Sequence, residues 1–251
     1  MKKFRLKIIG NGKINLILIH GWAFDSNVWI YIIQNLYKYF KIYLIDLPGY
    51  GINLNITVNN IEDIIRILKY NCPNNSIWIG WSLGGLIVNK IANKFPKKIL
   101  GIINIASSPC FIKKISWPGN SKKIFYNIYK NMKNNYFKTI KNFLEIQMLY
   151  KKNNFLKKKL LNHSQPKNKS IKIGLKIILE EDFRKFNYYT SIPILYILGE
   201  YDSIIPNKTY FILKENKNIN CVNIQKAAHT LILFNYEEIC SHILIFIKNI
   251  K

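Results

Sequence analysis

The feature that most constrains this chain is the alternation of short apolar runs with longer amphipathic stretches. Nearly continuous apolar residues, rich in Ile, Leu and Val, occupy positions 15–20, 41–46, 76–80, 100–106, 193–199 and 221–225. Runs of this kind are typical of strands that are covered on both faces. Between them, apolar residues recur at helical spacing over 28–40, 60–70, 84–95, 207–214 and 230–250. This order predicts an α/β fold with a mostly parallel central sheet flanked by helices.

The alternation stops between residues 111 and 189. This segment shows no strand pattern and has helix-like stretches around 122–150, 153–162 and 170–184. We interpret it as a helical lid insertion at the carboxyl edge of the sheet, so that 1–110 and 190–251 form the core and 111–189 form the lid. A chain of 251 residues is long enough for one large domain with such an insertion.

Several classes of protein are disfavoured by what the sequence lacks. The first residues contain no apolar stretch as long as a secretory signal requires, and no segment has the roughly 18 consecutive apolar residues of a membrane span. The four cysteines form no CxxC pair and have no histidine at ligand spacing. We therefore expect a cytoplasmic, monomeric protein with reduced thiols, no metal site and no membrane association.

The motif GWSLG at 80–84 follows the apolar run SIWI and precedes a helical stretch. A serine at such a strand-to-helix turn projects its hydroxyl above the sheet, which makes Ser82 a candidate nucleophile. Small residues must flank a backbone strained in this way, and Gly80, Gly84 and Gly85 provide the room. The amino end of the following helix supplies N–H groups that can stabilise an anionic intermediate.

A serine nucleophile needs a base and a carboxylate that orients the base. His229, in KAAHT after the last predicted strand, occupies the loop where this arrangement places its base. The acid is expected between Ser82 and His229 in chain order, at the end of a strand. Asp202 follows the run PILYILGEY and fits, whereas Asp182 lies in a charged helical face. Glu200 is the nearby alternative to Asp202.

Two backbone N–H groups are expected to bind the oxyanion. One belongs to Leu83, directly after the nucleophile, and the other to Trp22, in the HGW motif after the first predicted strand. We expect His20 to shape that loop. Asp46 begins DLPGYG and comes before the nucleophile in chain order, so we interpret it as part of a structural turn.

The motifs HGW, DLPGYG, GWSLGG, ASSP, LGEYDSIIP and KAAHT occur in this order over nearly the whole chain. Together they resemble the α/β-hydrolase superfamily. GWSLGGL, INIASSPCF followed by WPG, NFLEIQ and KAAHT resemble, more narrowly, the carboxylesterase family of pimeloyl-acyl-carrier-protein methyl ester esterases in biotin synthesis. The chain departs from that family in SIIP after Asp202 and in a shorter, more Lys- and Asn-rich insertion.

The resemblance implies specific roles. Ser82, Asp202 and His229 would form a catalytic triad, and Trp22 and Leu83 would line the oxyanion site and bind substrate. The acyl pocket would be lined from the lid by five residues: Phe143, Leu144, Glu145, Ile146 and Gln147. The reaction would be hydrolysis of the methyl ester of a pimeloyl group, with no metal or organic cofactor.

The formal charge of +25 is the other marked property of the sequence. It comes from a chain with 48 Ile, 32 Asn and 35 Lys, so A/T-rich codons explain part of it. Between 111 and 189 there are 19 basic and 4 acidic residues, a balance of 19 − 4 = +15. A basic lid would attract the acidic acyl-carrier protein that the resemblance implies as partner. The family tends to use Arg for this docking surface, whereas here Lys138 and Lys141 stand near the corresponding helix.

Three alternative functions can be compared with this one. A broad short-chain carboxylesterase, or another hydrolase acting on a small substrate, would use the same triad. A nucleic-acid-binding protein would use the charge, but the sequence has no zinc-finger, helix-turn-helix or aromatic RNA-binding motif, so we expect no nucleic-acid partner. A non-catalytic binding module is disfavoured because competent residue types fill all three triad positions.

Overall fold

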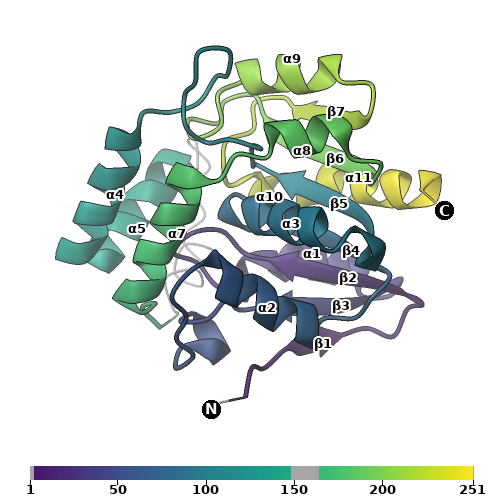
Figure 1. Ribbon diagram of the computed structural model, residues 1–251, viewed down its shortest axis with the longest axis horizontal. Coiled ribbons are helices and arrows are strands. Elements are labelled where there is room, and N and C mark those ends of the chain that lie inside the picture. Colours follow the sequence, from purple (N-terminus) through teal and green to yellow (C-terminus); the bar gives the residue numbers. More distant parts are fainter. Residues whose placement is uncertain (1–2, 148–163, 251) are drawn as a thin grey trace.

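The computed structural model describes residues 3–147 and 164–250. Within this part of the chain a seven-stranded sheet with the order β1-β3-β2-β4-β5-β6-β7 forms the centre (Figure 1). The strands are β1 (Lys7–Ile9), β2 (Ile14–Ile19), β3 (Phe40–Ile45), β4 (Ser76–Trp81), β5 (Ile99–Ile105), β6 (Ile194–Gly199) and β7 (Ile219–Ile224). β1 pairs with β3 in antiparallel fashion, and every other neighbouring pair is parallel. The predicted α/β fold with a mostly parallel sheet is thereby confirmed.

Side chains of one strand enter two separate cores, one on each face of the sheet. Leu16 and Leu18 of β2 belong to the first core, and Ile17 and Ile19 to the second. The first core is covered by α1 (Ile30–Leu36), α10 (Leu231–Phe234) and α11 (Tyr236–Asn249). The second is covered by α2 (Ile61–Asn71), α3 (Leu83–Lys94) and α9 (Lys208–Glu215). Burial on both faces explains why the strands read as continuous apolar runs.

Between β5 and β6 the described residues form the helices α4 (Lys122–Asn134), α5 (Tyr136–Gln147), α7 (Asn168–Glu180) and α8 (Arg184–Tyr189). α4 packs against α5 and α7, and α7 packs against α3 (Figure 1). Part of the predicted helical stretch 122–150 and all of 153–162 lie outside the described residues. The division into core and lid stays a prediction.

The structure differs from the sequence analysis at several places. The helix expected over 170–184 ends at Glu180, and α8 begins only at Arg184. The helical stretch expected from residue 122 is interrupted at Asn135, which separates α4 from α5. β1 was not predicted, because three half-exposed residues at a sheet edge carry almost no pattern. The helix expected over 28–40 ends at Leu36, and Phe40 begins β3. The helix expected over 230–250 is interrupted at Asn235, whose backbone (φ −122°, ψ 26°) is not helical. None of the helices in the described ranges is long and apolar enough to cross a membrane.

Candidate active site

Ser82 lies in the sharp turn between β4 and α3. Its backbone has φ 54° and ψ −118°, a left-handed conformation that costs a residue other than glycine about 1–3 kcal/mol. Two contacts from neighbouring strands and loops hold it there. The Ser82 N–H donates to the Ile105 carbonyl (3.0 Å), and the Ser107 hydroxyl donates to the Ser82 carbonyl (2.8 Å). A turn fixed in this way keeps the hydroxyl at the end of the sheet.

The glycines of this turn are required by close backbone approach. A Cβ added to Gly80 would lie 2.3 Å from the Gly84 carbonyl carbon, and one added to Gly84 would lie 2.3 Å from the Ile19 carbonyl oxygen. One added to Gly85 would lie 2.3 Å from the Ser107 hydroxyl oxygen. The prediction that these three residues provide room at the turn is confirmed.

The structure brings Ser82, His229 and Asp202 into one hydrogen-bonded chain. His229 Nε2 lies 2.9 Å from Ser82 Oγ, and His229 Nδ1 lies 2.8 Å from Asp202 Oδ2. Asp202 follows β6 and His229 follows β7, so all three residues lie at the carboxyl ends of parallel strands, although 147 positions separate Ser82 from His229. All three are buried. This geometry allows His229 to accept the serine proton while Asp202 holds its ring.

Asp202 is fixed by its own backbone surroundings. Its Oδ1 accepts hydrogen bonds from the N–H groups of Ile204 (2.8 Å) and Ile205 (2.9 Å), which leaves Oδ2 for His229. Glu200, the alternative acid, instead accepts from the Lys226 N–H (2.8 Å). Of the two carboxylates near this strand end, Asp202 therefore contacts His229, and Glu200 binds the backbone at Lys226.

An apolar pocket opens next to Ser82 and His229. Its other lining residues come from the loop after β2, from β4, from the loop and helices after β5 and from the loop after β6: Trp22, Ala23, Phe24, Trp81, Phe111, Phe125, Ile128, Met132, Thr139, Ile140, Phe143, Ile178 and Ile204. Phe143 stands edge-on to the His229 ring, with centroids 6.0 Å apart. Such a lining suits an aliphatic chain that ends at the serine hydroxyl.

The predicted acyl-pocket residues on α5 are placed differently from one another. Phe143 lines the pocket, whereas Leu144 is fully buried in the hydrophobic core and Glu145 is exposed to solvent. The reason is the helical period, which turns consecutive side chains about 100° apart. The side chains of Ile146 and Gln147 lie outside the described part of the chain.

Trp22 and Leu83, the expected oxyanion residues, are both near Ser82, because Leu83 follows it in the chain and Trp22 lines the same pocket. Leu83 is the first residue of α3, so its N–H is one of those that a helix leaves without an internal acceptor. Trp22 lines the pocket, and its indole N–H donates to the Ile171 carbonyl of α7 (2.9 Å). Gly174 of α7 leaves space for this ring, because a Cβ there would lie 2.5 Å from Trp22 Cδ1.

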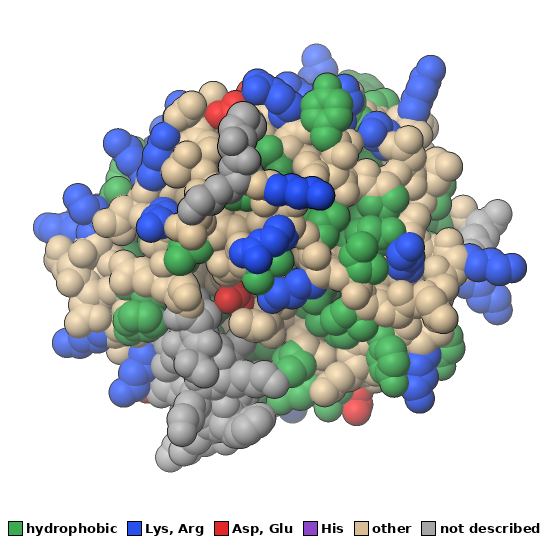
Figure 2. Space-filling view, turned by 90° about the horizontal axis from the view of Figure 1, so that it is seen from below, with side chains coloured by type: hydrophobic (Ala, Val, Ile, Leu, Met, Phe, Trp, Pro, Cys, Tyr) green, Lys and Arg blue, Asp and Glu red, His purple; other side chains and the backbone are tan. Residues whose placement is uncertain are grey.

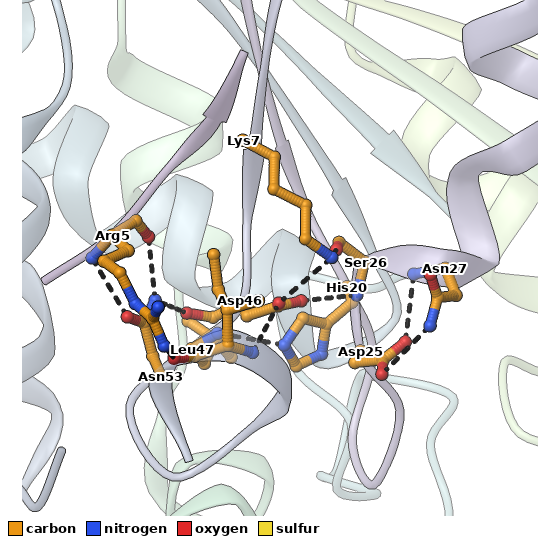
Figure 3. A network of polar contacts seen from close by, with 10 residues as sticks. Arg5, Lys7, His20, Asp25, Ser26, Asn27, Asp46, Leu47 and Asn53 are labelled. Atoms are coloured by element: carbon orange, nitrogen blue, oxygen red, sulfur yellow. Dashed lines mark hydrogen bonds and ion pairs between the residues drawn. The ribbon is translucent and has the colours of Figure 1, made fainter. Parts of the chain in front are cut away.

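A buried polar network anchors the loop that carries Trp22 (Figure 3). His20 Nδ1 lies 2.8 Å from the Gly21 carbonyl, and His20 Nε2 accepts from the Leu47 N–H (3.0 Å). Asp46 accepts from the Ser26 N–H (2.7 Å) and pairs with Lys7 of β1 (3.6 Å). These contacts agree with the interpretation of Asp46 as part of a structural turn and of His20 as a residue that shapes the loop.

The charge of Asp46 is stabilised inside this network. Burial alone would raise the pKa of its carboxyl group. Hydrogen bonds from the Ile52 and Ser26 N–H groups favour the charged form, and the pKa lies below its ordinary value of 3.8. Asp46 therefore stays ionised and holds the loop over the whole neutral range.

Sequence reasoning missed Trp81 and Tyr136. The Trp81 indole N–H donates to the His229 carbonyl (3.0 Å), so the residue before Ser82 also fixes the backbone at His229. Trp81 occupies the first unspecified position of the G-x-S-x-G pattern, so that pattern gives it no role. Tyr136 is the first residue of α5 and contacts the loop that carries Trp22.

The described residues contain no candidate metal site and no disulfide bond. No three His, Cys, Asp or Glu side chains there are grouped so that they could hold a metal ion. All four cysteines lie within the described ranges and are free thiols, three of them buried.

Comparison with known proteins agrees with the fold. Residues 14–236 match the family model described as the alpha/beta hydrolase fold. An esterase from Exiguobacterium antarcticum superposes with a TM-score of 0.86 at 18% identity, over 97% of this chain and 94% of that one. A thermophilic esterase from Thermogutta terrifontis gives 0.82 at 17% identity, over 98% and 93%. These two structures share the fold, and the chain belongs to the α/β-hydrolase family.

Relatives of higher sequence identity show to which α/β hydrolases the chain is similar in sequence. The pimeloyl-[acyl-carrier protein] methyl ester esterase of Wigglesworthia glossinidia brevipalpis is 42% identical over 256 residues, covering 99% of each chain. The protein of the same name from Pectobacterium carotovorum is 33% identical over 226 residues, covering 88% of this chain and 89% of that one. Within the α/β hydrolases this chain groups with these esterases and is a serine hydrolase of carboxylic esters. The resemblance seen in the sequence is thus confirmed.

Proposed function

We propose that this protein hydrolyses the methyl ester of a pimeloyl group carried by an acyl-carrier protein, with Ser82, His229 and Asp202 as its catalytic triad. One observation supports this most directly. The hydrogen-bonded chain from Ser82 to Asp202 opens onto an apolar pocket, in a protein that is 42% identical to an esterase named for this substrate.

The geometry suits a two-step acyl transfer. His229 takes the Ser82 proton as Oγ attacks the ester carbonyl carbon, and Asp202 stabilises the imidazolium that forms. The Trp22 and Leu83 N–H groups stabilise the oxyanion. Collapse of this intermediate breaks the bond to the methoxy group, which leaves as methanol with the proton from His229. Water, activated by His229, then attacks the acyl-enzyme and releases the free carboxylate.

The surroundings of the pocket suit a substrate tethered to a second protein. A more open groove adjoins the pocket. Thr139, Phe143 and Ile204 line both, so the two are connected. Its outer lining is polar and includes Lys138 and Asn142 of α5. An acyl chain in the pocket would therefore leave its linker in a groove that leads to a basic helix.

The carrier would dock on the surface of α5. Lys138 and Lys141 are both exposed there, in a segment with an excess of positive charge. Lys and Arg side chains are scattered widely over the face drawn in Figure 2, with few acidic ones among them. Positive charge is thus general, and the docking proposal depends on the position of Lys138 at the groove. Lysine would supply steering charge without the bidentate geometry of arginine.

The direct test is hydrolysis of methyl pimeloyl-acyl-carrier protein by the purified chain, with methanol release as the readout. We expect turnover by the unmodified protein and its loss in Ser82→Ala. Turnover of the carrier-linked ester should fall as salt rises from about 0.1 M to 1 M, because the screening length shrinks from about 10 to about 3 Å. Hydrolysis of free methyl esters with no preference for the carrier-linked one would instead indicate a broad carboxylesterase.

A charge-reversal pair tests the docking surface. Lys138→Glu combined with Lys141→Glu should raise KM for the carrier-linked ester several-fold and leave a small free ester unaffected. Lys97→Glu is the matched control, because Lys97 is exposed just before the amino end of β5, opposite the active site. An equal effect of the control variant would show that overall charge, and not α5, attracts the carrier.

A further inference from the structure

The loop that carries Trp22 contains a strained residue. Ala23 has φ 66°, in the left-handed region, and it is fully buried at the wall of the active-site pocket. A hydrogen bond from the Phe24 N–H to the Gly21 carbonyl (3.3 Å) closes a turn in which Ala23 is the third residue. Turns with a left-handed third residue normally place Gly or Asn there, because a Cβ is disfavoured. The turn therefore needs support from outside itself.

That support comes from α5, far away in the sequence. The Tyr136 hydroxyl donates to the Ala23 carbonyl at 2.5 Å, across 113 positions of the chain. This bond is much shorter than the one that closes the turn. Tyr136 is buried, and burial raises the pKa of its hydroxyl, so the group stays protonated and able to donate.

The two ends of this loop are fixed by separate contacts. His20 lies beside the Gly21 carbonyl. Asp46 accepts from the Ser26 N–H (Figure 3). Between these two anchors, Trp22 is tied to α7 by its indole and Ala23 to α5 by its carbonyl. Two helices that follow β5 are therefore hydrogen-bonded directly to the turn.

We infer that Tyr136 is a positioning residue, which holds the strained turn at Ala23 so that the Trp22 N–H faces the developing oxyanion. The inference depends on the proposed roles of Ser82 and Trp22 and is independent of the acyl group. Any relaxation of Ala23 to a negative φ changes the course of the chain next to Trp22. The tyrosine hydroxyl opposes that relaxation, and a phenylalanine at the same position would keep the packing while losing the bond.

The test is Tyr136→Phe in the full chain, assayed on p-nitrophenyl butyrate and on methyl pimeloyl-acyl-carrier protein. An oxyanion contact acts in the transition state, so kcat should fall with KM unchanged. The fall should be about five- to tenfold, the equivalent of one net hydrogen bond or of the penalty for one left-handed alanine. Tyr126→Phe, an exposed tyrosine of α4, is the matched control and should change neither constant.

Ala23→Gly supplies the second arm, because glycine adopts the left-handed conformation without penalty. In the Tyr136→Phe background it should recover most of the lost kcat. The inference is overturned if Tyr136→Phe leaves kcat unchanged, if it raises KM instead, or if Ala23→Gly brings no recovery.

The same variants in a double-mutant cycle of unfolding test the contact without activity. Coupling between positions 23 and 136 should be measurable, and additive effects would contradict the inference. If the unmodified protein hydrolysed neither ester, the proposed function would be wrong. The unfolding experiment would still show whether positions 23 and 136 are coupled.

Discussion

Asp202→Asn is the substitution whose effect the structure specifies most closely. The Oδ1 atom of Asp202 accepts two backbone hydrogen bonds, from Ile204 and Ile205, and Oδ2 faces His229. An asparagine in this place has one oxygen and one NH₂ group. The oxygen must face the two N–H donors, because NH₂ there would leave both of them unsatisfied. The NH₂ group therefore faces His229 Nδ1.

This arrangement favours the tautomer of His229 that carries its proton on Nε2, which cannot act as the base. Nδ1 must become an acceptor, so the proton of the neutral ring moves to Nε2, 2.9 Å from Ser82 Oγ. A protonated Nε2 cannot take the serine proton. In serine hydrolases generally, the equivalent change costs about 10⁴-fold in kcat, or about 5 kcal/mol of transition-state stabilisation. We expect a loss of that size, with KM nearly unchanged and the fold intact.

The assay is steady-state hydrolysis of p-nitrophenyl butyrate and of the carrier-linked methyl ester, with circular dichroism to check folding. Glu200→Gln is the matched control, because this nearby carboxylate bonds to the Lys226 N–H and not to the histidine. Its kcat should equal that of the unmodified protein. Near-normal turnover by Asp202→Asn, or an equal loss in Glu200→Gln, would refute the assignment of the acid.

Three further predictions concern the supports of the site. Gly80→Ala should destabilise the fold by about 3 kcal/mol or more in urea unfolding, because its Cβ would lie 2.3 Å from the Gly84 backbone. Asp46→Asn should cost about 2 kcal/mol at pH 7. Since the folded pKa of Asp46 lies below 3.8, its contribution persists above that pH and is lost as pH falls through the folded value, so the difference between variant and unmodified protein should shrink in acid. Trp81→Phe should lower stability by about 1–3 kcal/mol and kcat several-fold, because the indole N–H no longer holds the His229 carbonyl.

The sequence was sufficient to predict the central sheet and the three converging residues. Strands buried on both faces leave continuous apolar runs, and parallel strands bring their carboxyl ends to one edge. Ser82, Asp202 and His229 each follow such a run, so chain order together with residue chemistry placed them at the same edge. The glycines around Ser82 were equally readable, because only a close backbone approach explains three of them at that spacing.

The remaining features depend on contacts between distant segments, which leave no local pattern. Tyr136 looks like an ordinary helix residue until the fold places its hydroxyl on Ala23. Ala23 itself gives no sign in the sequence that its φ is positive. Leu144 and Glu145 were grouped with Phe143 as neighbours in one motif, yet their side chains leave the helix in different directions. A motif identifies a segment of the chain. The direction of each of its side chains depends on the position of that residue around the helix axis.

Composition explains which parts of this chain are informative. Ile, Lys and Asn make up 115 of its 251 residues, so an individual lysine on the surface carries little evidence for a partner. The histidines are scarce by comparison, with four in the chain. Two of them, His20 and His229, are buried, one next to the Gly21 carbonyl in the loop that carries Trp22 and the other 2.9 Å from Ser82 Oγ. Functional inference in such a chain should therefore rest on its scarce residue types and on strained positions such as Ala23, where general composition supplies no explanation.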